Sequence, residues 1–194
     1  MAARRTILSA LTVLAVGLSL LSGCTPADPA GQPTYSCTPD DGSTPYPCYK
    51  VQYDAKAKET ALYAEAEGVY RKFFAEEERI YRSGGVTQPT SVLLETTTGD
   101  YQAAVMAVYS DLVKYKTSAI GGTFKLVWTK HVPTGGRPGI VTALQTCVDA
   151  SSVRMTAKGA DPAPGGIASE VIYFSRDGDS LKLTDLDPKE VTQC

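Results

Sequence analysis

Residues 123–132, TFKLVWTKHV, mark the point at which the sequence changes from a helical pattern to a strand pattern. Phe124, Leu126 and Trp128 occupy alternate positions, which is the spacing of a strand with one buried face. The same alternation predicts further strands at 140–150, 152–158, 167–176 and 181–187. Asp177 and Gly178 predict a tight turn between the last two strands. This part of the chain is therefore expected to form an antiparallel sheet.

A long helix is expected before these strands. Residues 54–82 carry apolar side chains at three- and four-residue spacing on two adjacent faces. One face has Leu62, Ala66, Val69, Phe73 and Ile80, and the other has Tyr63, Tyr70, Phe74 and Tyr81. Asp54 is expected to cap this helix, and Gly84 and Gly85 are expected to end it. The acidic run at 76–78 is expected to lie on the solvated face.

Two further helices complete the predicted order of elements. Residues 90–94 favour one short helical turn, and Gly99 and Asp100 begin a second long helix that Gly121 and Gly122 are expected to end. Helices followed by a meander of antiparallel strands are typical of an α+β fold. The sequence thus predicts N-terminal helices packed on an antiparallel sheet.

The N-terminus has the features of an export signal. Arg4 and Arg5 precede an apolar run at 7–21, which is shorter than the roughly 20 residues that a membrane-spanning helix needs. Residues 21–24, LSGC, resemble the lipobox of bacterial lipoproteins. This resemblance implies cleavage before Cys24 and attachment of acyl chains such as palmitate to its thiol. The alternative, an ordinary signal cleaved elsewhere, leaves Cys24 as a free thiol in an exported protein.

Three segments are expected on this basis. Residues 1–23 form a lipoprotein signal peptide, residues 24–50 a lipidated N-terminus with a Pro-rich tether, and residues 51–194 the α+β domain. Without residues 1–23 the chain has 17 basic and 21 acidic residues. No basic stripe is present, so the composition argues against nucleic acid as a partner.

The remaining cysteines predict disulfide bonds. They are Cys37, Cys48, Cys147 and Cys194. An even number in an exported chain indicates two bridges, for which three pairings exist. The favoured pairing joins Cys37 to Cys48, closing a short loop, and Cys147 to Cys194, joining the chain end to a strand. No CxxC motif occurs and His131 is the single histidine, so a metal site is not expected.

The order of elements resembles that of nuclear-transport-factor-2-like domains, in particular those of actinobacterial and actinophage lipoproteins. The resemblance rests on the long helix, on the segments TGDYQAAVMAVYSDL (98–112), TCVD (146–149) and RDGDSLKLTDL (176–186), and on Cys194. It implies a curved sheet wrapped by helices into a cone with a cavity at its mouth. In those lipoproteins a strand cysteine and the C-terminal cysteine commonly approach each other, which agrees with the favoured pairing. The family contains enzymes and non-enzymes, so fold alone does not give function.

The sequence offers few candidates for an enzymatic site within this framework. An isomerase-like site needs a carboxylate base and an oxyanion donor in an apolar cavity. Asp149 is the candidate base, and the candidate donors are Tyr70, Tyr101, Tyr109 and Tyr173. Asp149, however, stands at a strand end before ASS, where a turn-forming role is favoured. His131 is expected to be exposed at a strand end, and common hydrolase motifs are absent.

The sequence therefore favours a non-enzymatic binding or interaction module, anchored through Cys24 to the extracytoplasmic face of the cell membrane. An envelope protein or a small apolar ligand is the expected partner, and no catalytic residue or cofactor is assigned. Two alternatives stay open. One is an isomerase- or dehydratase-like enzyme that uses the cone cavity. The other is a phage-encoded surface lipoprotein that acts in superinfection exclusion.

Overall fold

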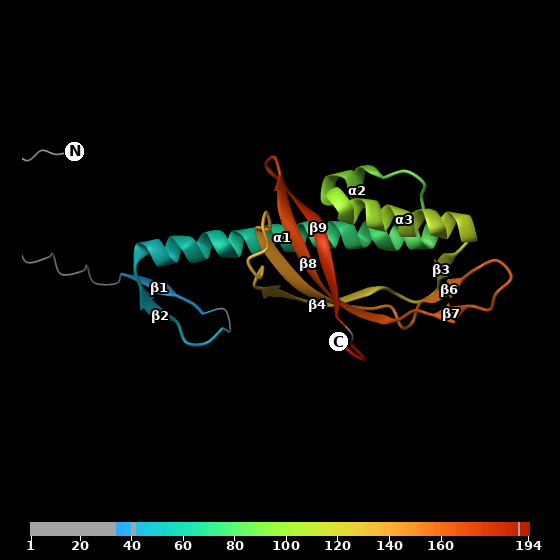
Figure 1. Ribbon diagram of the computed structural model, residues 1–194. Coiled ribbons are helices and arrows are strands. Elements are labelled where there is room, and N and C mark those ends of the chain that lie inside the picture. Colours follow the sequence, from blue (N-terminus) through green and yellow to red (C-terminus); the bar gives the residue numbers. More distant parts are fainter. Residues whose placement is uncertain (1–33, 40–41, 190) are drawn as a thin grey trace, which may run out of the picture.

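The protein is described by a computed structural model that covers residues 34–39, 42–189 and 191–194 (Figure 1). It begins with a hairpin of β1 (Tyr35–Cys37) and β2 (Tyr46–Cys48). The helices α1 (Lys50–Ser83), α2 (Ser91–Thr96) and α3 (Gly99–Tyr115) follow. The expected signal segment and Cys24 lie outside the described residues.

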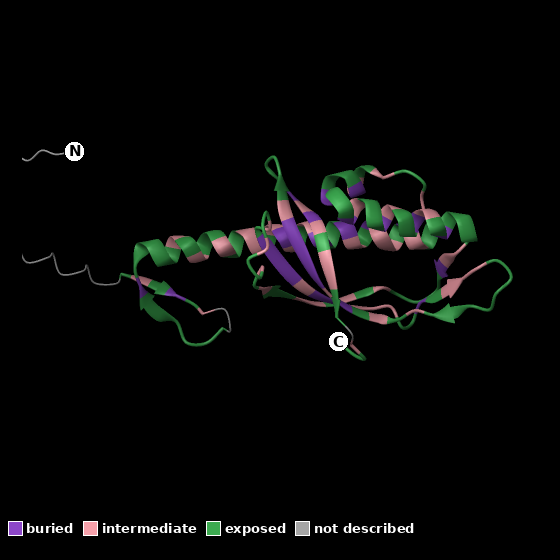
Figure 2. Ribbon diagram, viewed as in Figure 1, coloured by how far each residue is buried: buried purple, intermediate pink, exposed green. Residues whose placement is uncertain are grey.

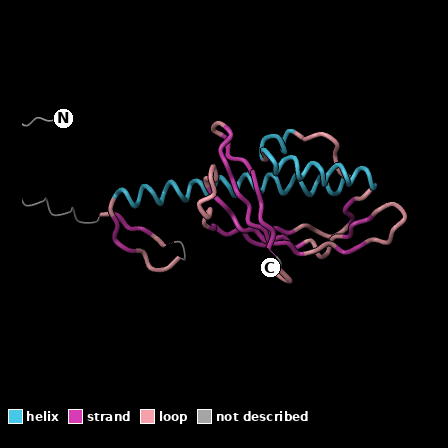
Figure 3. The backbone as a smooth tube through the Cα atoms, in the orientation of Figure 1, coloured by secondary structure: helices cyan, strands magenta, loops and turns pink. Residues whose placement is uncertain are grey.

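The main sheet is antiparallel, with the strand order β4-β5-β8-β9. Its strands are β4 (Lys125–Val132), β5 (Thr142–Asp149), β8 (Ile167–Asp177) and β9 (Ser180–Lys189). The sheet curves, and α1 and α3 run across one of its faces (Figure 3). The α+β class predicted from the order of elements is therefore correct.

A second sheet of three short strands lies near the C-terminal end of α1 (Figure 1). It consists of β3 (Ser118–Ile120), β6 (Arg154–Thr156) and β7 (Ala163–Pro164). The hairpin of β1 and β2 lies at the opposite end of α1. The long helix thus connects two separate small β structures on either side of the main sheet.

The core forms where the helices meet the concave face of the main sheet. Phe73 of α1 and Tyr109 of α3 are buried in one apolar cluster with Leu144, Ile172 and Leu183 of the sheet. Figure 2 shows buried positions on the helices and on the strands of the main sheet. Burial of one such side chain contributes about 1.5–3 kcal/mol. This packing holds the inner face of α1 against the strands and fixes which of its residues lie inside the molecule.

Two helix boundaries differ from the sequence prediction. Helix α1 begins at Lys50 with Tyr49 as its N-cap, whereas Asp54 lies in the first turns and pairs with Lys50 at 2.5 Å. Helix α3 ends at Tyr115, because Lys116 adopts a left-handed conformation with φ 54°. Gly121 and Gly122 therefore do not end α3. The predicted end of α1 is correct, since Gly84 is its left-handed C-cap with φ 83°.

The faces of β4 also differ from the prediction. Leu126 pairs with Val148, but the next paired residue is Trp128, which pairs with Cys147. Val127 is thus an extra residue, and this β-bulge turns Trp128 to the convex face of the sheet. There the Trp128 indole Nε1 donates to the carbonyl oxygen of Cys194 at 3.1 Å. Leu126 and Trp128 therefore do not share the buried face that simple alternation predicts.

Candidate functional site

An acidic side chain lies in the interior between α1 and α3. Glu77 belongs to the face of α1 that also carries Tyr70, Phe74 and Tyr81, and its side chain is half-buried. The hydroxyl group of Tyr109 on α3 donates a hydrogen bond to Glu77 Oε1 at 3.2 Å. A carboxyl group and a phenol therefore meet inside a largely aromatic environment.

Burial controls the protonation of this group. It raises the pKa of Glu77 from 4.5 to about 7, and the negative charge of Glu170 raises that pKa further. The hydrogen bond from Tyr109 acts in the opposite direction and lowers the pKa of Glu77. Burial also raises the pKa of Tyr81 to about 12 and the pKa of Tyr109 above its usual range. Near neutral pH, Glu77 can therefore either donate or accept a proton.

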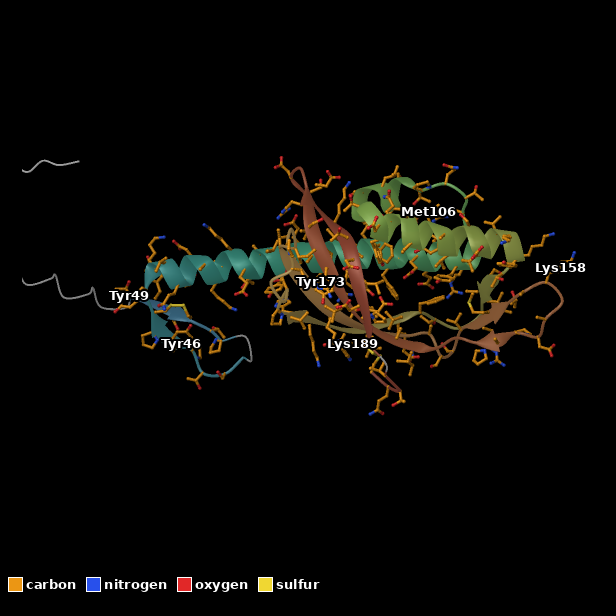
Figure 4. All side chains as sticks on the ribbon, viewed as in Figure 1. Tyr46, Tyr49, Met106, Lys158, Tyr173 and Lys189 are labelled. Atoms are coloured by element: carbon orange, nitrogen blue, oxygen red, sulfur yellow. A yellow bond between two sulfur atoms is a disulfide. The ribbon has the colours of Figure 1, made fainter. Side chains whose placement is uncertain are left out.

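Glu170 of β8 is the second interior carboxyl group, and burial raises its pKa. It pairs in register with Thr146 and with Pro188, and is half-buried. It also lines a recess of about 880 Å³ between the ends of β8 and β9 and the C-terminal residues. Figure 4 labels Lys189 at this end of β9. The lining residues are Ile167, Ala168, Ser169, Glu170, Pro188, Lys189, Val191, Thr192 and Gln193.

The four tyrosines considered from the sequence fall into two groups. Tyr70, Tyr101 and Tyr109 belong to the interior core, where burial raises the pKa of each. Tyr173 instead faces the convex side of the sheet, where its hydroxyl donates to Asp187 Oδ2 at 2.9 Å. The structure therefore brings three of these tyrosines together and separates the fourth.

The acidic residues on the convex side of the sheet form ion pairs. The guanidinium group of Arg137 lies 3.9 Å from the ring centroid of Tyr173. Arg137 also pairs with Asp185 at 2.8 Å and with Asp187. At the hairpin turn, Asp177 pairs with Lys182 at 2.7 Å. These carboxylates thus bind side-chain cations of the same chain.

Asp149 forms a turn, as the sequence indicated. Its Oδ1 accepts hydrogen bonds from the backbone nitrogen of Ser151 at 2.9 Å and from the Ser151 hydroxyl at 2.6 Å. These bonds stabilise the carboxylate and lower the pKa of Asp149. Asp149 is therefore a turn residue, and the interior tyrosines have Glu77 and Glu170 as their acidic neighbours instead.

His131 is exposed at the end of β4, as expected, but it also makes a specific contact. Its ring stacks on Tyr63 with 3.5 Å between the ring centroids, and burial lowers its pKa. The pair lies at one end of a groove of about 650 Å³ between β1, α1 and β4. The helical wall of this groove includes three small side chains, Ala57, Ala61 and Ala64.

The prediction for the acidic run at 76–78 is wrong. Glu76 is 8% exposed and pairs with Arg79 at 2.7 Å, and Glu77 faces the interior. Of the three, only Glu78 follows the prediction, since it forms a surface ion pair with Arg82 at 2.8 Å. The burial of Glu77 could have been predicted from its spacing, because position 77 lies on the same helical face as positions 70, 74 and 81.

The cysteine pairs agree with the favoured pairing. Cys37 and Cys48 are joined with 5.9 Å between their Cα atoms, and Cys147 and Cys194 with 5.8 Å. The first pair closes the hairpin of β1 and β2. The second pair fixes the C-terminus, and with it one wall of the recess that Glu170 lines.

No protein-family model, curated protein sequence or solved structure matches the chain. None of the helices formed by the described residues combines the length and the apolar character that crossing a membrane requires. Within residues 34–39, 42–189 and 191–194, no three His, Cys, Asp or Glu side chains are grouped so as to hold a metal ion.

Proposed function

We propose that the chain is an exported lipoprotein, anchored through Cys24 to the extracytoplasmic face of the cell membrane, whose domain binds a small ligand. The segment at 21–24 supports the anchor, since it places a thiol after small residues at the end of a short apolar run. The two cysteine pairs support an oxidising compartment, because disulfides persist outside the cytosol.

A nuclear-transport-factor-2-like fold is part of this proposal. Its support is the long helix α1 and the helix α3, which lie across the concave face of a curved antiparallel sheet (Figure 1). In such an arrangement the space between helices and sheet is where a ligand is expected. The interior carboxyl groups of Glu77 and Glu170 lie in this region.

The observation that carries the binding proposal is the position of Glu170. Glu170 lines the recess of about 880 Å³, and its negative charge also raises the pKa of Glu77 in the interior. Ligand sites are concave, mostly apolar and contain a few convergent polar groups with perturbed pKa values. The ligand class that fits is a small apolar molecule with one hydroxyl, carbonyl or amine group to meet the carboxyl.

The test uses the full chain isolated from its native membrane. Mass spectrometry is expected to find the acyl group on Cys24 and a co-purifying small molecule. Ala168→Trp should fill the recess and abolish recovery of that molecule, whereas Ala163→Trp, an exposed alanine on β7, should leave recovery unchanged. An unmodified N-terminus at another residue contradicts the anchor. Absence of any ligand, or equal recovery with Ala168→Trp, contradicts the binding site.

A second candidate function is proton-transfer catalysis on the bound molecule. The hydrogen bond from Tyr109 to Glu77 favours it, because a carboxyl group with a pKa of about 7 beside a phenol suits a general base and a hydrogen-bond donor. Incubation of the recovered ligand in D₂O with the wild-type chain should then place deuterium on a carbon atom. No incorporation above that of Glu77→Gln would exclude this chemistry.

A further inference from the structure

The N-terminal end of α1 and the preceding hairpin expose several large apolar side chains. They are Tyr46, Tyr49, Val51 and Tyr53, with exposed fractions of 47%, 45%, 73% and 44%. Four of the eleven exposed large apolar side chains in the described residues thus lie within eight consecutive positions. We call these four residues the aromatic end. Figure 4 labels Tyr46 and Tyr49 there.

The aromatic end is held in a defined shape. The Cys37–Cys48 pair closes the hairpin, and β1 packs against the start of α1. The ring centroids of Tyr35 and Tyr53 lie 5.0 Å apart, which joins strand to helix. The residues of the aromatic end are therefore exposed on a surface whose shape is held by these contacts. Figure 2 shows that the described residues at this end are mostly exposed, whereas buried residues are concentrated in the middle of the main sheet.

The aromatic end is also the end of the molecule from which the chain continues towards Cys24. Residues 24–33 separate Cys24 from the first described residue, Thr34. A fully extended chain spans at most about 3.6 Å per residue, so this segment reaches no more than about 36 Å. Helix α1 has 34 residues and is about 50 Å long. An anchor at Cys24 therefore keeps the aromatic end within reach of the membrane surface.

The chemistry of these side chains fits the membrane–water interface. Tyrosine has an apolar ring and a polar hydroxyl group, and it concentrates at the headgroup level of membranes. One acyl chain binds a membrane only marginally, so an additional contact strengthens the attachment. The exposed Val51 adds apolar area at this end of α1.

We infer that the aromatic end lies on the membrane surface and orients α1, so that the recess is displayed away from the lipid. This inference rests on the proposed anchoring at Cys24. The occupant of the surface is the headgroup and upper acyl region of a phospholipid bilayer. If these residues contact a second protein instead, the chain is expected not to bind vesicles.

The test measures vesicle binding without the anchor. The chain from residue 24 with Cys24→Ser carries no lipid and is sedimented with equimolar phosphatidylglycerol and phosphatidylethanolamine vesicles. Tyr46→Ser, Tyr49→Ser and Val51→Ser combined should lower the partition coefficient about tenfold or more. The matched control combines Val108→Ser, Val113→Ser and Tyr115→Ser, which are exposed on α3 at 47%, 40% and 57%. The control should bind like the chain with Cys24→Ser alone.

Failure of this inference is separable from failure of the anchor. Mass spectrometry of the native protein decides whether Cys24 is acylated, and it does not depend on the tyrosines. No vesicle binding by the chain with Cys24→Ser, or equal loss in both triple variants, overturns the membrane contact even if Cys24 carries lipid. Equal melting temperatures of the two triple variants show that a difference in binding reflects the surface and not folding.

Discussion

The hydroxyl group of Tyr109 on α3 donates a hydrogen bond over 3.2 Å to Glu77 Oε1 on α1. The two residues are 32 positions apart in sequence, and their contact joins the two long helices inside the molecule. Burying a carboxyl group is costly when it is charged, and protonation removes that cost. This relationship makes the stability of the domain depend on pH.

Replacement of Glu77 by Gln should remove one component of that dependence. The folded-state pKa of Glu77 is raised from 4.5 to about 7, so the folded chain holds this proton more tightly than the unfolded chain. Its contribution to stability is complete below pH 4.5 and is lost as the pH rises to about 7. The loss is about 3 kcal/mol. Urea unfolding between pH 4 and 9 should show this decline in the wild-type chain and a smaller decline in Glu77→Gln.

The control for this experiment is Glu95→Gln. The Glu95 side chain is 60% exposed and pairs with Lys72 on the surface. Its replacement should leave the decline in stability unchanged. If wild-type and Glu77→Gln chains lose stability in parallel from pH 4.5 to 7, then Glu77 does not hold a proton in the folded state.

Replacement of Tyr109 by Phe should shift the protonation of Glu77. The hydrogen bond stabilises the charged carboxylate and lowers the pKa of Glu77, so its removal should raise that pKa above about 7. The lost bond should also cost about 1 kcal/mol of stability. Carbon-13 NMR of the Glu77 carboxyl group during a pH titration measures the shift. A pKa that is unchanged or lower in Tyr109→Phe would show that the bond is not made in solution.

The sequence predicted the elements of the fold better than their faces. Alternation at 123–132 and the 3.6-residue period at 54–82 are local properties of the chain, so they predict strands and helices directly. The bulge at Val127 breaks the alternation through backbone geometry alone and moves Trp128 to the other face. The left-handed Lys116 likewise ends α3 without a glycine.

The candidate site was less predictable for a different reason. Charged side chains are most often exposed, so the sequence predicts that the whole run at 76–78 faces solvent. Each residue of a helix faces a different direction, and only position 77 continues the stripe of Tyr70, Phe74 and Tyr81. The position of Glu170 cannot be predicted from local sequence, because it depends on the register of β8 against β5 and β9.

The two disulfide pairs should differ in what they stabilise. Cys147–Cys194 closes a 47-residue separation and ties the C-terminus beneath Trp128, so Cys194→Ala should cost about 2–4 kcal/mol for the whole domain. Cys37→Ala opens only the hairpin of β1 and β2, whose contacts are with the start of α1. Thermal unfolding without reductant should show a much larger fall in melting temperature for Cys194→Ala, together with a change in Trp128 fluorescence. Equal effects of both variants would contradict the global role of the C-terminal pair.

Replacement of Gly85 by Ala tests how closely α3 approaches the end of α1. Gly85 has φ 95°, and an added Cβ would lie 2.2 Å from the carbonyl oxygen of Tyr109 and 2.8 Å from Leu112 Cβ. The helices would have to separate, which would disturb the contact between Tyr109 and Glu77, so Gly85→Ala should cost about 3 kcal/mol or more. Gly135→Ala is the matched control, because Gly135 has φ 67° but no atom within 4 Å of an added Cβ. That variant should cost about 1 kcal/mol from backbone strain alone. Chemical denaturation of both variants measures the difference, and similar losses would mean that strain in the backbone, rather than the approach of α3, accounts for glycine at position 85.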